Sequence, residues 1–164
     1  MNYRKITSKI ASRLTLPEVY TFYCLAMKSD FETMQSSINE ETLADVVGLN
    51  VRTIQRHIRK MRFKLLLYID TTKHKKDGKY FRKNKYRLIT DNYILVTERL
   101  MELDLSREMK GFLILLKTQC FNHTSRCDYS TRDLALQLNI GKSTVDRYLN
   151  EASEKGYIKW NKKD

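Results

Sequence analysis

Several side chains between residues 51 and 62 are of the types that read the edges of DNA bases. Ile54, Ile58 and Met61 are spaced as one apolar stripe of a helix, so we expect them to face a core. The residue types on the opposite, polar face match the partners found in the major groove. Arginine binds guanine, glutamine binds adenine, and a threonine in the first turn of a helix can bind a phosphate. A solvated face without a partner is the simpler alternative. The residues predicted to contact DNA here are Arg52, Thr53, Gln55, Arg56 and Arg59.

A dense group of cations follows between residues 71 and 85. Two runs rich in aliphatic and aromatic residues, 65–70 and 80–89, flank Asp77-Gly78, which favours a tight turn and hence a β-hairpin. Because such a cluster repels itself, we expect the DNA backbone or minor groove beside it, with a flexible solubilising loop as the alternative. The predicted contacts are Lys73, Lys75, Lys76, Lys79, Arg82 and Lys83, in a cluster that also holds His74 and Lys85. Tyr80 and Tyr86 are expected to pack within the hairpin.

The chain contains an internal repeat. Residues 43–61 align without a gap on residues 134–152, at an offset of 91, and their apolar positions agree nearly throughout. An upstream segment from Leu14 matches one from Leu103 at an offset of 89, so we expect a loop to absorb the difference. The repeat predicts two copies of one module.

Each copy, residues 1–90 and 91–164, carries signals for three helices. Thr15 and Glu18 form a capping-box pattern, and Asp104 is predicted to be the equivalent cap in the second copy. The second helices are predicted to follow the caps Asn39 and Ser130, and tight turns at 48–50 and 139–141 lead to third helices at 51–62 and 142–155.

Two helices joined by a tight turn and followed by a hairpin form a winged helix-turn-helix. Residues 91–104 are predicted to form a connecting helix. Only residues 156–160 follow the last helix of the second copy before the final polar residues, so its wing should be short or absent. The predicted fold class is mainly α (α+β), with two tandem winged helix-turn-helix modules.

Charge distinguishes the two copies. Of 31 Lys+Arg and 19 Asp+Glu, residues 1–90 hold 19 and 8, a net of +11, whereas residues 91–164 hold 12 and 11, a net of +1. A basic first copy favours a polyanionic partner, nucleic acid first and an anionic membrane surface second. The second copy could contact DNA or serve dimerisation. Its candidate DNA contacts are Lys142, Ser143, Thr144 and Arg147.

Catalytic and metal-binding signals are weak. The sequence has no glycine-rich phosphate loop and no HExxH or GxSxG motif, so we expect no enzyme, although a nuclease with scattered carboxylates stays open. Cys120, His123 and Cys127 are closely spaced but lack an obvious fourth zinc ligand, so we expect neither a metal nor a cofactor. Three cysteines without a secretory signal, and no apolar run of membrane-spanning length, predict a cytoplasmic protein with no membrane partner.

The run LADVVGLNVRTIQRHIRKM, followed by a basic hairpin, resembles the winged helix-turn-helix regulators of bacteria and their phages. The paired arrangement is similar to the tandem winged-helix replication initiators of plasmids. The resemblance implies binding to double-stranded DNA and regulation of transcription, with replication initiation on a mobile element as the alternative. Transcription or replication machinery is then a possible partner, and the apolar run 112–116 predicts packing on the first copy or in a homodimer. A protein-interaction module without any DNA role is the alternative from another class.

Overall fold

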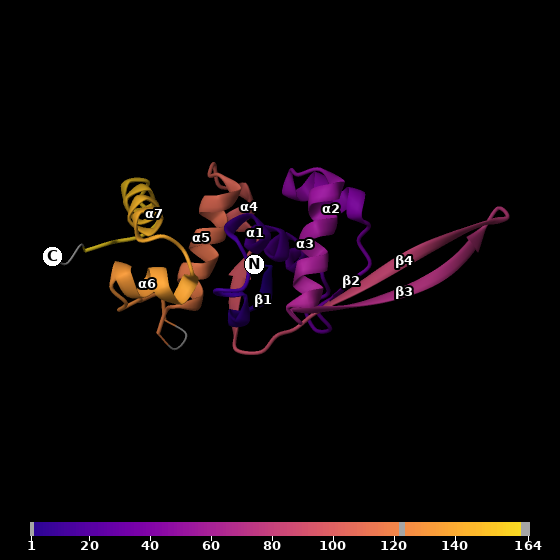
Figure 1. The fold of residues 1–164 in the computed structure, drawn as a ribbon, viewed down its shortest axis with the longest axis horizontal. Helices are drawn as coiled ribbons and strands as arrows, with labels where there is room; N and C mark the ends of the chain where they lie inside the picture. The colour runs from indigo at the N-terminus through magenta and orange to yellow at the C-terminus, as the bar shows by residue number, and fades with distance from the viewer. Residues whose placement is uncertain (1, 122–123, 162–164) are drawn as a thin grey trace.

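The structure is a computed structural model that describes residues 2–121 and 124–161. Over these residues the chain is a mixed α+β protein with seven α-helices and two small antiparallel sheets (Figure 1). The α+β class predicted from the sequence is confirmed, although strands contribute more than a mainly α protein would have. Among the described residues, no helix has the length and apolar character needed to cross a bilayer.

The first copy of the repeat combines three helices with a three-stranded sheet. These elements are α1 (Leu16–Met27), β2 (Gln35–Ser36), α2 (Glu40–Val47), α3 (Val51–Phe63), β3 (Leu67–Lys76) and β4 (Lys79–Leu88). β4 is the central strand, and Asp77 and Gly78 join it to β3 with φ values of 54° and 77°. This two-residue turn with both φ angles positive confirms the predicted hairpin. The two residues of β2 are too few to show an alternating pattern, so the sequence did not predict that strand.

The second copy repeats the helices of the first. α5 (Arg107–Thr118), α6 (Thr131–Leu138) and α7 (Lys142–Glu154) have 12, 8 and 13 residues, the same lengths as α1, α2 and α3. The prediction that Asp104 caps α5 is wrong, because the side chain of Ser106 accepts the N–H bond of Met109 at the start of this helix. Ser106 lies 91 residues after Thr15, the N-cap of α1, so the upstream helices share the offset of the other helices.

The turns before α3 and α7 form as predicted. Gly48 (φ 81°) and Asn139 (φ 53°) adopt the left-handed conformation that ends α2 and α6. The side chains of Asn39 and Ser130 accept backbone N–H bonds at the starts of these helices. The local residue types therefore account for the boundaries of both helix pairs.

The predicted connecting helix at 91–104 is wrong. The segment contains strand β5 (Tyr93–Thr97) and the short helix α4 (Arg99–Glu102). β5 pairs antiparallel with β1 (Tyr3–Thr7), which a 3-10 turn at Ser8–Ile10 follows. β5 forms because its aromatic and β-branched residues find a partner strand about ninety residues earlier in the chain.

Strands β1 and β5 join the two copies of the repeat as an antiparallel pair. Tyr3 lies opposite Thr97, and Thr7 lies opposite Tyr93, so the start of each strand meets the end of the other. The two strands occupy equivalent places in the two copies of the repeat, as in a self-complementary interface between identical subunits.

The equivalent helices α1 and α5 also pack against each other. A Cβ atom added to Gly111 would lie 2.2 Å from the carbonyl oxygen of Leu16, so the two backbones touch there. Lys110 lies with its Nζ atom 5.3 Å from the centre of the Tyr20 ring. Helix α5 therefore packs on the first copy through α1, which is one of the two predicted alternatives.

Candidate nucleic-acid interface

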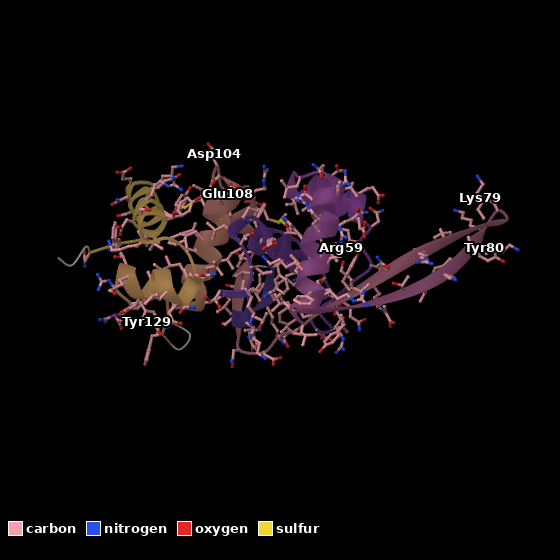
Figure 2. The ribbon with its side chains drawn as sticks, in the orientation of Figure 1. Arg59, Lys79, Tyr80, Asp104, Glu108 and Tyr129 are labelled. Atoms are coloured by element: carbon pink, nitrogen blue, oxygen red, sulfur yellow. The ribbon has the colours of Figure 1, made fainter. Side chains whose placement is uncertain are left out.

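Helix α3 presents a polar face because its apolar stripe is buried. Ile54, Ile58 and Met61 are only 0–3% exposed, as predicted. The predicted contact residues of this helix reach the surface: Arg52, Gln55, Arg56 and Arg59 are exposed, and Thr53 is half-buried. Figure 2 labels Arg59 on this helix.

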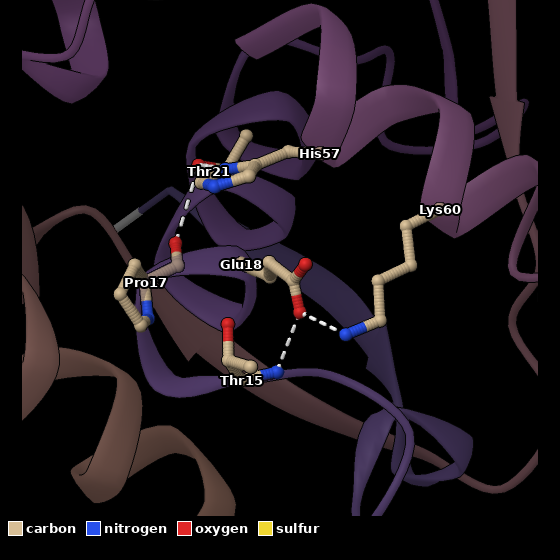
Figure 3. Close-up of polar contacts among 6 residues, drawn as sticks. All are labelled: Thr15, Pro17, Glu18, Thr21, His57 and Lys60. Atoms are coloured by element: carbon tan, nitrogen blue, oxygen red, sulfur yellow. Dashed lines mark hydrogen bonds and ion pairs between the residues drawn. The ribbon is translucent and has the colours of Figure 1, made fainter. Parts of the chain in front are cut away.

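A buried histidine holds α3 on α1 (Figure 3). His57 is 8% exposed, and its Nδ1 atom lies 2.8 Å from the hydroxyl of Thr21. That hydroxyl donates to the carbonyl of Pro17 at 3.2 Å, so the histidine nitrogen must be the donor in the contact between them. Burial lowers the pKa of His57, which keeps the ring neutral at neutral pH.

An ion pair forms a second link between the same helices (Figure 3). One carboxylate oxygen of Glu18 accepts the backbone N–H of Thr15 at 2.7 Å and lies 2.7 Å from Nζ of Lys60. Burial raises the pKa of Glu18, but the bonds from Lys60 and Thr15 outweigh it, and the net pKa is lowered. The carboxylate that caps α1 therefore also fixes the orientation of α3.

Three contacts restrict the exposed face of α3. Gln55 donates its side-chain amide to Glu40 of α2 at 2.7 Å, so a base would have to replace this carboxylate. The backbone N–H of Thr53 donates to the side-chain oxygen of Asn50 at 2.8 Å, so it is not open to a phosphate. Arg56 reaches only the Thr53 hydroxyl, at 3.3 Å. Arg52, Arg56 and Arg59 are thus more available to a ligand than Gln55.

The hairpin β3–β4 projects from the body as a two-stranded arm (Figure 1). Each strand has 10 residues, so at about 3.3 Å per residue the hairpin is roughly 33 Å long, and its exposed part, residues 70–76 of β3, accounts for roughly 23 Å of this. Near the body one face is buried, with Leu67, Tyr86 and Leu88 at 1–3% exposure. Residues 70–83 are all exposed, and the register between the strands is unbroken to the turn. The basic segment is therefore a paired ribbon.

All six predicted contacts of the hairpin lie on this arm. They are exposed, and none forms an ion pair with a carboxylate of the described residues: Lys73, Lys75, Lys76, Lys79, Arg82 and Lys83. Arg87, which was not among the candidates, lies opposite Tyr68 with its guanidinium 4.9 Å from the ring centre. The alternation of residues along β4 could have identified it, because Lys83, Lys85 and Arg87 share one face.

The outcome differs for the two tyrosines of the hairpin. Tyr86 is buried at 1% exposure, as expected. The expectation for Tyr80 is wrong, since it is 74% exposed at the tip, where only Lys75 covers its ring at 5.4 Å (Figure 2). Next to it, Phe81 stacks on His74. No body lies beneath the tip for these rings to pack on, so both are open to a partner.

Helix α7 occupies the place of α3 in the second copy but presents a neutral face. Lys142, Ser143 and Arg147 are exposed, and Thr144 is half-buried. Lys142 is paired with Asp146 at 3.0 Å, and Arg147 lies over the ring of Tyr148 at 5.1 Å. Residues 156–161 form no strand.

The cysteines give no metal site in the described part of the chain. Cys120 and Cys127 are half-buried and free, and burial raises the pKa of both thiols. His123, the third residue of the weighed zinc set, lies outside the described residues. No group of three or more metal-ligating side chains occurs among residues 2–121 and 124–161.

Comparisons with protein-family models, with curated proteins and with solved structures gave no match for this chain.

Proposed function

We propose that this chain binds double-stranded DNA, mainly through α3 and the β3–β4 arm of the first copy, and regulates transcription. Each copy would then be a winged helix-turn-helix module, the second without a full wing. The observation that carries the proposal is the row of exposed cations without carboxylate partners on the arm, next to a helix whose arginines face outward. Phosphates supply the missing counter-charge, and arginine supplies base recognition.

The geometry supports different roles for α3 and the arm in binding DNA. α3 is held on α1 by the contacts of His57 and Lys60, so its arginines are carried on a fixed surface. The exposed part of the arm extends roughly 23 Å beyond the body, where its lysines and the exposed Tyr80 suit the backbone or the minor groove of DNA beside α3.

Replication initiation on a plasmid, phage or other mobile element is the second candidate. The matching lengths of the helices in the two copies favour it, since paired winged helices are the feature shared with plasmid initiators. The neutral face of α7 favours the regulator. Sequencing DNA fragments selected by the purified protein separates the two: one palindrome near a promoter supports a regulator, and tandem direct repeats support an initiator.

A salt titration tests DNA binding itself. If about six phosphates are neutralised, log K should fall against log salt concentration with a slope near −5. Replacing Lys75, Lys76 and Lys79 by glutamine should flatten the slope by about two to three units, because each phosphate contact contributes roughly one unit. The matched control replaces Lys142, Arg147 and Lys155 of the second copy and should leave the slope nearly unchanged. An unchanged slope in the arm variant would remove the arm from the interface.

A further inference from the structure

The second copy of the repeat contains a half-open cavity of about 620 Å³. The residues that line it include Leu113 and Leu116 of α5, Leu134 of α6, Leu149 of α7, and Trp160 on the segment after α7. A half-open space of this volume with mostly apolar walls is within the range of ligand pockets.

The repeat explains why the space exists. After α3 the chain turns at Leu65 (φ 59°), and Leu66 donates its N–H to Met61 at 2.9 Å. After α7 it turns in the same way at Gly156 (φ 81°), and Tyr157 donates to Ala152, also at 2.9 Å. Residues 157–160 therefore follow the course of residues 66–69, where strand β3 begins.

In the first copy, a second strand pairs with the segment equivalent to residues 157–160. β4 pairs with β3, with Leu88 opposite Leu67 and Tyr86 opposite Ile69, and both side chains of β4 are buried. In the second copy, no strand within residues 124–161 pairs with residues 158–161. The cavity lies between this unpaired segment and the helices, where the side chains of such a strand would pack.

We propose that an extended segment of a partner protein completes this copy by pairing with residues 158–161 and inserting two apolar side chains, at alternate positions, into the cavity. β4 is the template for this occupant, since its Tyr86 and Leu88 fill the equivalent place. Among the described residues that line it, the charged side chains are Lys117 and Lys159 and none is a carboxylate, so the inserted segment is acidic. Strand addition of this kind takes affinity from backbone bonds and specificity from pockets for alternate side chains.

Trp160 is the single tryptophan of the chain and reports on the cavity directly. The probe is a peptide with the sequence of residues 84–90 in which the lysine and the arginine are replaced by glutamate. Titrated into the full chain without DNA, it should change the Trp160 emission saturably and slow hydrogen exchange at residues 157–161. The same peptide with alternate backbone amides methylated, which cannot form strand bonds, should bind at least about tenfold more weakly. Leu113→Phe or Leu116→Phe, each checked for native circular dichroism, should also weaken binding by filling the space.

Two outcomes would overturn the proposal. Absence of any emission change at millimolar peptide would show that the segment accepts no strand. Equal binding of the methylated peptide would show that the cavity takes apolar side chains without any strand pairing. Because no DNA is present, either failure leaves the proposed DNA binding intact.

Discussion

Replacing Gly111 by alanine should destabilise the fold by separating the two copies of the repeat. The new Cβ atom would lie 2.2 Å from the Leu16 carbonyl oxygen and 3.0 Å from its carbonyl carbon, and backbone atoms cannot rotate away. Overpacking of this kind costs about 3 kcal/mol, and the better helix propensity of alanine returns about 1 kcal/mol. The expected net loss is about 2 kcal/mol, or a fall in Tm of about 4–8 °C for a chain of this length.

Urea unfolding followed by far-ultraviolet circular dichroism measures this loss. Gly141→Ala is the matched control, since its Cβ would make an ordinary 3.8 Å contact with Thr144, and it should change stability by less than about 1 kcal/mol. A Gly111→Ala protein as stable as the native chain, or more stable, would refute the close contact between α1 and α5.

Two further predictions concern α3. Because the folded pKa of His57 lies below its unfolded value near 6.5, the unfolded chain binds this proton first, so the free energy of unfolding should fall as the pH drops below about 6.5. His57→Gln should flatten that dependence in urea titrations between pH 5 and 7; equal slopes in the native and substituted proteins would refute the assignment. Arg56→Ala should weaken binding to a selected DNA site by about 1–3 kcal/mol and binding to random DNA by much less. Arg147→Ala, at the equivalent position of α7, is the control and should weaken neither. Equal losses on both DNAs would make Arg56 a phosphate contact.

The sequence predicted those helix ends and turns that depend on a few neighbouring residues. The caps at Asn39 and Ser130, the left-handed residues Gly48 and Asn139 and the Asp77-Gly78 turn depend on a few neighbouring side chains, and they appear where the sequence placed them. Strand β5 was read as a helix because its five residues are too few for a clear period and because β1, which stabilises it, is far away in the sequence.

In the candidate site, too, features that depend on neighbouring residues were predicted and contacts between distant elements were not. Helical periodicity placed the arginines of α3 on the surface, but it could not show that Glu40, on another helix, engages Gln55. Both tyrosines of the hairpin were expected to pack within it, and Tyr86 is buried, but Tyr80 is exposed because the arm extends past the body and neither of its faces is covered there. Contacts between elements depend on the tertiary structure, and so does the number of strand residues that pack on the rest of the protein. Neither can be read from the local sequence.

Hydrogen exchange of the full chain with and without a duplex of about 20 base pairs tests the central claim most directly. The amides of α3 and its preceding turn, together with those of the arm at residues 71–85, should gain protection on binding, and those of α7 should change little. Protection confined to α7, or no protection at a duplex concentration that saturates binding, would contradict an interface built from α3 and the arm.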